Sequence, residues 1–460
     1  MEQYDAIVIG SGQAGGPLAK KLALAGKKTA LIEKRWIGGT CVNDGCTPTK
    51  TWVASAKAAY MASHSKHLGI DIEGYSVNMP VIKSRKDEIV HQFRDGSKNG
   101  LEATENLTLY FGTASFTGYK TIQIVLNDGG TLELKADLIF INTGAKPFIP
   151  EVEGIQQIDY LDSTKILELE KVPEHLLVLG GNYIGLEFGQ MFRRFGSKVT
   201  VLERSGRIVS REDEDVSESL NQILKAEDIV IYTNTSLSKL EKAENHIDVT
   251  ILNNGEEEKI SVSHVLLATG RTPNTGHLHL DKTGVEINTH GFINVNNQLE
   301  TSTQGIYALG DVKGGPAFTH ISYNDFTIVY RNLIEGANLN ITDRPVPYCM
   351  FTDPQLGHIG LSEQEAKKFN LNYKVAKMPM AWVARAIENG DTRGFMKAIV
   401  DADTKLILGA TVLGPEGGEI MTIFQMAMMG KITYEELRYC VFAHPLYAES
   451  INNLFLSFDN

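Results

Sequence analysis

Residues 6–15 read AIVIGSGQAG, an apolar run that ends in a glycine-rich loop. The glycines of the pattern are Gly10, Gly12 and Gly15. Such a run is typical of a buried strand that turns into a helix, where glycine lets the backbone approach a pyrophosphate. A second apolar run, TALIE at residues 29–33, ends at Glu33, where a carboxylate can bind an adenosine ribose. The sequence therefore predicts a dinucleotide-binding βαβ unit, with a glycine-rich turn in another α/β fold as the alternative.

The same plan returns further along the chain. Residues 176–185 read LLVLGGNYIG, and the strand pattern VTVLE at residues 199–203 ends in an acidic residue. Gly10, Gly15, Gly26 and Glu33 map onto Gly180, Gly185, Gly196 and Glu203, each 170 residues later. Because each copy lies between a strand pattern and a helix pattern, the repeat predicts two bound dinucleotides.

A cysteine pair lies shortly after the first copy, in GGTCVNDGCTPTK at residues 38–50. Cys41 and Cys46 are close enough in sequence to form a small disulfide loop. Pro48 predicts that a helix begins there, and a thiol at a helix N-terminus is favoured as the thiolate. Lys50 shares the helix face of Cys46 and adds positive charge. The arrangement suits a disulfide that opens and closes, although a structural disulfide or two unrelated thiols remain open. Together with two dinucleotides, it indicates a flavin that accepts hydride from a nicotinamide.

The second glycine loop gives two indications of how a nicotinamide dinucleotide binds. Asn182 replaces the middle glycine, and its side chain stands where the pyrophosphate approaches, so we expect weaker or slightly displaced binding. Glu203 favours NADH, because a carboxylate repels a 2′-phosphate. Arg204, Arg207 and Arg211 follow closely, and one of them could accommodate that phosphate. NADPH therefore stays open.

Length and composition set the frame for these motifs. A chain of 460 residues is expected to form about three domains. The net charge of −12 argues against binding to nucleic acid or to an anionic membrane surface. Four cysteines with one close pair do not form a secreted disulfide framework. Neither a signal peptide nor an apolar stretch of membrane-spanning length stands out, so we expect a cytoplasmic protein without a resident metal.

With these motifs, the chain resembles the class I pyridine nucleotide–disulfide oxidoreductases, the family of dihydrolipoyl dehydrogenase, glutathione reductase and mercuric reductase. The resemblance covers essentially the whole length. The segments that carry it are residues 39–50, INTGA at 141–145, LATGRTPN at 267–274, TSTQGIYALGD at 301–311, and His444-Pro445 with Glu449. It implies an α/β protein with two Rossmann-like dinucleotide-binding domains, for FAD and NAD(P), plus a C-terminal α+β dimerisation domain.

The resemblance also implies domain boundaries. They are an FAD domain at 1–146, a nicotinamide domain at 147–269, completion of the FAD domain at 270–340, and an interface domain at 341–460. Within the last domain we expect strands at 394–400 and 407–413 and a helix from about residue 418 to 429. The Met-rich face of this helix is interpreted as interface core.

By the same resemblance, Cys46 is the charge-transfer thiol that faces the flavin, and Cys41 is the thiol that exchanges with substrate. Lys50 would lie near flavin N5 and pair with Glu187. Tyr183 would be an aromatic gate over the nicotinamide pocket. From the residues alone, the favoured interpretations are a helix-packing aromatic for Tyr183 and a solvated helix residue for Glu187.

The resemblance makes His444 the acid and base for Cys41, working across a homodimer interface with its ring oriented by Glu449. A carboxylate raises the basicity of imidazole, which suits proton transfer to and from a thiolate. Leu446 replaces a small hydroxyl residue, and Tyr447 adds bulk beside the base. Both affect the expected shape of the substrate channel.

The expected cofactor residues form two sets. Those for FAD are Gly10, Gly12, Gly15, Glu33, Thr40, Lys50, Ala114, Thr143, Gly144, Asp311 and Thr319. Those for the nicotinamide dinucleotide are Gly180, Asn182, Tyr183, Ile184, Gly185, Glu203 and Gly270.

Within the family, the redox segment and residues 348–360 look most like the mercuric-reductase-like branch, which includes flavoproteins linked to reactive-chlorine resistance. Mercuric reductase itself is disfavoured, because the chain lacks its C-terminal cysteine pair and its N-terminal metal-binding domain. Cys349 and Cys440 lie among apolar residues and are interpreted as buried thiols. Glu203 disfavours glutathione reductase. Dihydrolipoyl dehydrogenase, a flavin-only NADH:quinone or metal reductase and a redox sensor stay open, and the acceptor is expected to be a small molecule.

Overall fold

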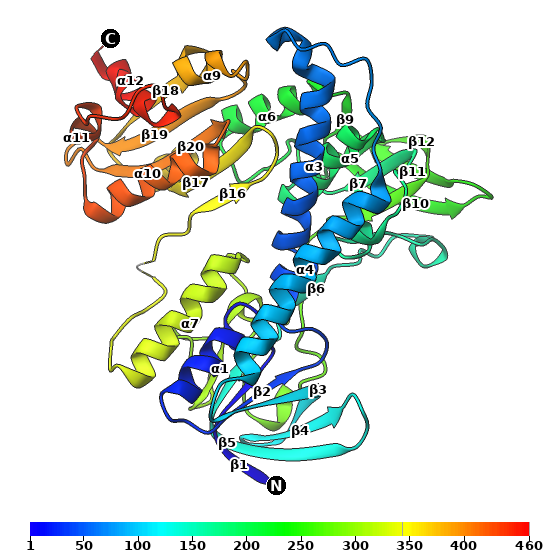
Figure 1. The fold of residues 1–460 in the computed structure, drawn as a ribbon, viewed down its shortest axis with the longest axis vertical. Helices are drawn as coiled ribbons and strands as arrows, with labels where there is room; N and C mark the ends of the chain where they lie inside the picture. Colours follow the sequence, from blue (N-terminus) through cyan, green and yellow to red (C-terminus); the bar gives the residue numbers. More distant parts are fainter. Residues whose placement is uncertain (343, 460) are drawn as a thin grey trace. The chain divides into compact units, whose positions relative to one another are not determined.

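The computed structural model describes residues 1–342 and 344–459, and the chain divides into two compact units (Figure 1). The first unit comprises Met1–Thr51, Lys83–Phe148 and Gly270–Arg344. The second comprises Trp52–Ile82, Ile149–Thr269 and Pro345–Asn460. Two long helices, α3 (Cys46–His64) and α4 (Met79–Glu102), each contribute residues to both units.

The first unit is built on one sheet. Its strands are β1 (Glu2–Ile9), β2 (Thr29–Glu33), β3 (Leu107–Gly118), β4 (Thr121–Leu126), β5 (Thr131–Ile141) and β15 (Ile306–Ala308). β1 lies between β2 and β5 and is parallel to both, with β3 beyond β2, β15 beyond β5, and β4 antiparallel to β3 and β5. The apolar ends of β1 and β2 are buried, as expected for parallel strands covered on both faces. Helices α1 (Gly15–Leu24) and α7 (Thr319–Ile334) pack together, and α1 covers β1 and β2 (Figure 1).

The second unit repeats the core of the first. Its parallel strands are β7 (His175–Leu179), β8 (Lys198–Leu202), β9 (Ile229–Tyr232) and β13 (His264–Leu267). Their order, β13-β7-β8-β9, corresponds to β5-β1-β2-β3. The register is also repeated: Ala6 lies opposite Thr29 in the first sheet, and Leu176 lies opposite Val199 in the second, each 170 residues later. The predicted pair of Rossmann-like units is therefore confirmed.

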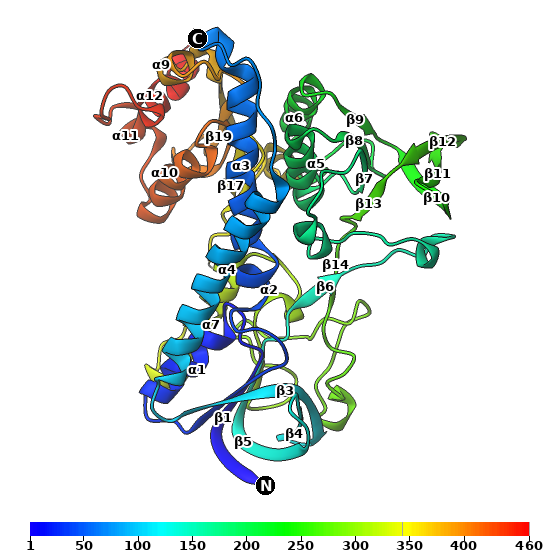
Figure 2. The same ribbon diagram turned by 45° about the vertical axis from the view of Figure 1, so that its right-hand side comes forward.

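Other elements surround this second core. Helix α5 (Tyr183–Phe195) packs on β7 and β8, and α6 (Glu214–Ala226) packs on β9 (Figure 2). The separate antiparallel sheet consists of β10 (Thr235–Lys242), β11 (Ile247–Asn253) and β12 (Glu256–Val262). A short two-stranded sheet in the first unit pairs β6 (Ala145–Pro147) with β14 (Arg271–Pro273).

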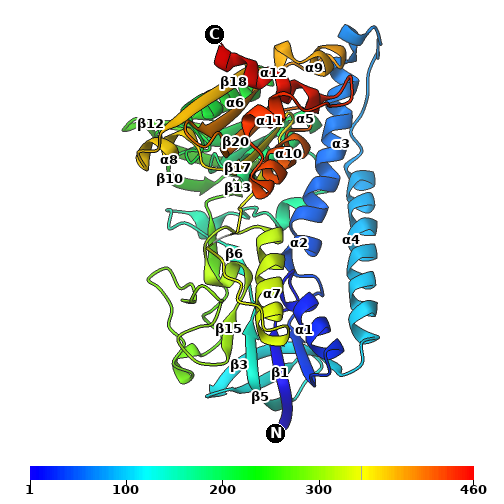
Figure 3. The same ribbon diagram turned by 90° about the vertical axis from the view of Figure 1, so that its left-hand side faces the viewer.

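The C-terminal part of the second unit is an antiparallel sheet with helices packed on it (Figure 3). In spatial order the strands are β16 (Tyr348–Met350), β17 (Gln355–Gly360), β20 (Ile407–Gly414), β19 (Phe395–Asp401) and β18 (Tyr373–Pro379). Helix α10 (Gly417–Gly430) packs on β17 and β20, and α12 (Ser450–Leu456) packs on β18. The predicted strands at 394–400 and 407–413 and the predicted helix near 418–429 agree with β19, β20 and α10 to within two residues.

The remaining helices are short. They are α2 (Gly39–Asn43), α8 (Glu363–Lys368), α9 (Ala384–Glu388) and α11 (Tyr434–Arg438). Within residues 1–342 and 344–459, no helix has both the length and the apolar character of a membrane span.

Candidate active site

The loop between β1 and α1 leaves space that only glycine provides. Gly10 has a φ of +98°, and a Cβ added there would lie 2.3 Å from the carbonyl oxygen of Asn142. A Cβ on Gly15 would lie 2.0 Å from the carbonyl oxygen of Gly10. The bare backbone therefore stands at the positive end of α1, which suits a pyrophosphate.

Glu33 is held beside this loop at the end of β2. Its Oε2 accepts hydrogen bonds from the backbone N–H of Ser11 at 3.0 Å and from the Ser11 hydroxyl at 2.8 Å. Its Oε1 accepts from the N–H of Arg35 at 2.9 Å. The carboxylate is thus fixed at the end of β2, and its contact with an adenosine ribose stays a prediction.

Asn142 joins the loop to two other segments, which the sequence interpretation missed. Its Oδ1 accepts from the N–H of Gly15 at 2.9 Å, and its Nδ2 donates to the carbonyl oxygen of Leu309 at 2.9 Å. Next to it, the Thr143 hydroxyl donates to the carbonyl oxygen of Asn274 at 3.0 Å. A signal was available, because Asn142 directly follows a buried strand in the segment INTGA.

Asp311 supplies a half-buried carboxyl group in the same unit. Burial raises the pKa of the Asp311 carboxyl, although the charges of Arg271 and Lys313 act in the opposite direction. Among the described residues, Arg271 Nε is a buried donor that makes no hydrogen bond, and it lies 3.9 Å from Asp311 Oδ2. A half-buried carboxyl and a guanidinium whose Nε has no hydrogen bond fit a ligand with hydroxyl and phosphate groups, so these residues suit FAD.

The other residues predicted for FAD also belong to this unit. Thr40 lies on α2, Lys50 on α3, Ala114 on β3, Thr143 and Gly144 directly after β5, and Thr319 at the start of α7. Their individual contacts with FAD stay predictions.

The two cysteines lie near the loop between β1 and α1, which we call the cofactor loop. Cys41 is on α2, Cys46 is the first residue of α3, and both are present as thiols. A Cβ on Gly39 would lie 2.7 Å from Gly12 Cα, so the backbone of α2 contacts the loop. The hydrogen bond with Cys46, together with burial and the charge of that sulfur, raises the pKa of the Cys41 thiol. Cys41 therefore favours its protonated form and needs a base to remove the proton.

Two arginines hold the segment between the cysteines. Arg35 forms an ion pair with Asp44. Arg94 Nε donates to Asn43 Oδ1 at 2.7 Å, and its guanidinium lies 4.4 Å from the centre of the Trp36 ring. This anchoring depends on α4, which is distant in sequence, and the sequence interpretation missed it.

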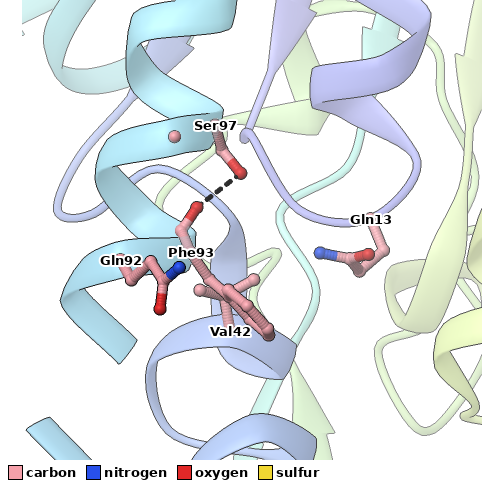
Figure 4. A pocket seen from close by; sticks show the side chains of 6 residues that line it. Gln13, Val42, Gln92, Phe93 and Ser97 are labelled. Carbon is pink, nitrogen blue, oxygen red and sulfur yellow. Dashed lines mark hydrogen bonds between the residues drawn. The ribbon is translucent and has the colours of Figure 1, made fainter. Parts of the chain in front are cut away.

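An open cavity of about 460 Å³ adjoins the same segments (Figure 4). Its lining residues are Gln13, Val42, Gln92, Phe93, Gly96 and Ser97. Gln13 belongs to the cofactor loop and Val42 directly follows Cys41, while the other four lie on α4. The cavity therefore borders both the loop between β1 and α1 and helix α2, which carries Cys41.

The second glycine loop repeats the backbone hydrogen bonds that the acidic residue accepts in the first. A Cβ on Gly180, whose φ is +112°, would lie 2.4 Å from the carbonyl oxygen of Ala268. Glu203 Oε2 accepts from the N–H of Gly181 at 2.8 Å, and its Oε1 accepts from the N–H of Ser205 at 2.7 Å. These are the counterparts of the contacts that Glu33 makes, so this loop also fits a dinucleotide.

Asn182 caps α5 in this loop. Its φ of −116° and ψ of −177° are extended, and its Oδ1 accepts from the N–H of Tyr183 at 3.0 Å. The side chain therefore occupies a donor at the helix N-terminus that a phosphate could otherwise use. Of the other residues predicted here, Ile184 lies on α5, whereas Gly270 belongs to the first unit.

A buried carboxylate fixes Tyr183. The hydroxyls of Tyr183 and Tyr348 each donate to Glu212 Oε1 at 2.7 Å, and the two rings stack with centroids 5.5 Å apart. One turn along α5, Glu187 Oε1 accepts from the N–H of Phe351 at 2.7 Å. Helix α5 is thus fastened to the segment around β16. The predicted pair of Glu187 with Lys50 joins residues of different units and stays a prediction.

The proposed base forms the expected dyad. His444 Nδ1 lies 3.0 Å from each carboxylate oxygen of Glu449. The His444 side chain is 74% exposed, so its ring is accessible from outside the subunit. Tyr447, next to the base, accepts a hydrogen bond from Asn389 Nδ2 at 2.9 Å, which turns its phenol toward α9.

Comparison with known proteins identifies the family. Residues 4–325 match the family described as pyridine nucleotide-disulphide oxidoreductase. The chain belongs to the pyridine nucleotide–disulfide oxidoreductases. Residues 346–455 match the dimerisation domain of this family, so the protein is a homodimer. It is an oxidoreductase that uses FAD and NAD(P)H and acts on a sulfur group.

Individual relatives of this family are similar over nearly the whole chain. A probable pyridine nucleotide-disulfide oxidoreductase, RclA of Escherichia coli, is 37% identical, with 99% of each chain covered. Mercuric reductase of Lysinibacillus sphaericus is 33% identical over 100% of this chain and 83% of its own length. The solved Cu(II) complex of the HOCl-induced flavoprotein disulfide reductase RclA is 36% identical with a TM-score of 0.91, and the match covers 99% of this chain and 100% of that chain. The predicted mercuric-reductase-like branch is confirmed.

The interpretation of Cys349 and Cys440 as buried thiols is wrong. Cys440 is exposed and Cys349 is half-buried. The neighbours Tyr439 and Val441 are 75% and 96% exposed, so the apolar residues around Cys440 face outward. An apolar stretch of sequence therefore indicates either a buried core or a surface that contacts another subunit.

Proposed function

We propose that the protein couples the oxidation of NADH to the reduction of a Cys41–Cys46 disulfide and passes the electrons to a small-molecule acceptor. FAD, when bound, supplies the two-electron exchange between the nicotinamide and the disulfide. The observation that carries the proposal is the contact between Gly39 of helix α2, which carries Cys41, and Gly12 of the loop between β1 and α1. In this reaction, NADH and one proton reduce the disulfide to a dithiol, and NADH is oxidised to NAD⁺.

The two cysteines have different tasks. Cys46 stands at the N-terminus of α3, where helix N–H groups and the dipole stabilise a thiolate. Cys41 exchanges with the acceptor, and its raised pKa means that it needs a base. His444 of the partner subunit takes the proton from Cys41 as the new bond forms and returns it to the departing thiol. Glu449 orients the ring of that base.

The nicotinamide is NADH. Glu203 holds a carboxylate at the end of β8, which repels a 2′-phosphate. The guanidinium of Arg207 already donates to the carbonyl oxygens of Ser210 and Glu212 and to Gln364 Oε1. Of the nearby arginines, Arg207 is therefore tied to the protein and poorly placed for a phosphate.

The chain has three functional domains and acts in the cytoplasm. The FAD domain comprises residues 1–146 and 270–340, the nicotinamide domain 147–269, and the interface domain 341–460. The enzyme works in the cytoplasm, where the dithiol state of the cysteine pair can be regenerated.

A thiophilic metal ion is a second candidate acceptor. The related RclA structure is a Cu(II) complex, and another relative is a mercuric reductase. Cys46 is exposed and Cys41 is half-buried, so both sulfurs can be reached. Thiolates are ligands that such soft ions prefer.

The experiment compares acceptors on the purified, flavin-loaded homodimer. NADH consumption is measured with lipoamide, with Cu(II) and with a quinone, for the wild type, Cys41→Ser and His444→Ala. Turnover of lipoamide that both substitutions abolish supports disulfide exchange. Turnover of Cu(II) that depends on Cys41 alone favours the metal. Quinone turnover that neither substitution changes would show a flavin-only enzyme and overturn the proposal.

A further inference from the structure

Two helix N-termini meet at the sulfur of Cys46. Cys46 is the first residue of α3, which has 19 residues, and Thr319 is the first residue of α7, which has 16. The Thr319 hydroxyl oxygen lies 3.4 Å from Cys46 Sγ. Both helices belong in this region to the first unit, so the contact lies within one compact body.

We propose that Thr319 is a positioning residue for the redox reaction, whose hydroxyl donates a hydrogen bond to the Cys46 sulfur and stabilises its thiolate. The inference rests on the proposed function, in which Cys46 is the thiol that faces the flavin. It assigns a task to the side chain of Thr319, whereas the sequence expectation gave this residue only a contact with FAD.

The chemistry of the two groups supports the assignment. A thiolate only accepts hydrogen bonds, so the hydroxyl must donate when Cys46 is ionised. Hydrogen bonds to charged groups are stronger than those between neutral groups, and α7 directs the positive end of its dipole to the same place. The contact with Thr319 also lowers the pKa of Cys41, against the stronger effects of Cys46 and burial. The hydroxyl therefore favours the ionised state of the thiol pair.

Other titratable groups lie on the elements around the sulfur. They are Cys41 on α2, Asp44 with its partner Arg35, Lys50 on α3, and His320 on α7, whose ring stacks on Phe318 at 5.4 Å. All of them are present in a Thr319 variant as well. Because a threonine hydroxyl does not titrate in this range, the difference between variant and wild type isolates the hydrogen bond.

The effect extends to the reduction potential. An interaction that stabilises the reduced, ionised dithiol makes the disulfide easier to reduce. Removing the hydroxyl should raise the apparent pKa of the Cys46 thiolate by about one pH unit. That tenfold change corresponds to a disulfide potential about 30 mV more negative above the pKa.

The test uses Thr319→Val, which keeps the shape and removes the hydroxyl, and Thr319→Ser, which keeps the hydroxyl. Each flavin-loaded homodimer is reduced anaerobically with NADH, and the long-wavelength thiolate–flavin absorbance is followed against pH. The disulfide potential is measured in a glutathione redox buffer. We expect the shift of about one pH unit and the lower potential in Thr319→Val, with both restored in Thr319→Ser.

The outcomes separate this inference from the proposed function. A Thr319→Val protein that titrates like the wild type overturns the inference and leaves the proposed function intact. A wild type that shows no thiolate–flavin absorbance after NADH reduction overturns both. If Thr319→Val fails to retain flavin, Thr319→Ala and Thr319→Ser are compared instead, and equal thiolate titrations of these two overturn the inference.

Discussion

The Nδ1 atom of His444 lies 3.0 Å from both carboxylate oxygens of Glu449. Nδ1 therefore donates its hydrogen to the carboxylate, which leaves Nε2 as the acceptor that can take a proton. The imidazole side chain is 74% exposed, whereas that of Glu449 is only 20% exposed. The dyad thus presents a base at the surface with its orienting group held behind it.

Loss of this dyad should slow the reduction of the disulfide acceptor but not the reduction of the flavin by NADH. His444→Ala should lower kcat/KM for a disulfide acceptor by about 10²- to 10⁴-fold, because general acid–base catalysis contributes that much. Glu449→Gln should cause a smaller loss in the same step, since the ring remains but loses its orientation. Stopped-flow measurement of flavin reduction by NADH serves as the control. If either variant slows flavin reduction as much as disulfide turnover, the assignment of the dyad to Cys41 is wrong.

Asn182 should limit the affinity for NADH. Asn182→Gly releases the N–H of Tyr183 for the pyrophosphate, so we expect the Kd for NADH to fall several-fold. Replacing an asparagine cap by glycine costs only a few tenths of a kcal/mol in helix stability. Asn182→Asp is the matched control, because it keeps the cap and adds a negative charge that should weaken binding. The Kd comes from the NADH dependence of flavin reduction. An unchanged Kd in Asn182→Gly would mean that the pyrophosphate does not use this donor.

Glu203 should set the preference between nicotinamides. Glu203→Gln removes the negative charge and keeps one acceptor oxygen, for the N–H of either Gly181 or Ser205. A charge contact of about 1–4 kcal/mol corresponds to about a fivefold change or more, so the NADPH-to-NADH ratio of kcat/KM should rise by at least about fivefold. Steady-state rates with both nucleotides measure the ratio. The same preference in variant and wild type would exclude Glu203 as the discriminating residue.

A buried ionic network should make part of the stability depend on pH. Asp353 accepts from Arg194 Nη1 at 2.8 Å, and Arg393 and Lys57 lie nearby. Burial acts to raise the pKa of Asp353, but the charge of Arg194, reinforced by the other two cations, outweighs it and lowers the pKa overall. Because the folded pKa lies below the unfolded value of about 3.9, this stabilisation is present above that pH and is lost as the pH falls through the folded pKa.

Asp353→Asn should therefore lower the free energy of unfolding by about 3–5 kcal/mol at neutral pH. The deficit should shrink below pH ~3.9, as the wild-type carboxyl is protonated. Urea unfolding of wild type and variant at several pH values measures it. Arg194→Met provides a second perturbation of the same pair, and a deficit that stays constant with pH would contradict the electrostatic explanation.

The glycine loops could be predicted because their requirements are local. Gly10 and Gly180 need a positive φ and bare backbone wherever a strand turns into a helix around a phosphate, so the sequence pattern alone located both. The structure adds that the strand register repeats with the same offset of 170 residues, which the sequence analysis had not predicted. The dyad of His444 and Glu449 was predicted from family resemblance, and its hydrogen bond agrees.

Other parts of the site depend on contacts between distant segments. Tyr348 meets Glu212 across 136 residues, and Asn142 meets Leu309 across 167. No local pattern marks such partners, because the fold brings them together only after the sheets form. At Cys440 a local pattern was present but misleading. Its apolar neighbours suggested a core, whereas the segment faces outward.

The most direct test of the proposed electron path is NADH-driven reduction of lipoamide by wild type and Cys41→Ser, matched for flavin content. The account predicts that NADH still reduces the flavin of Cys41→Ser at close to the wild-type rate, while lipoamide turnover disappears. A Cys41→Ser enzyme that reduces lipoamide at the wild-type rate would contradict the account, because electrons would then reach the acceptor without the cysteine pair.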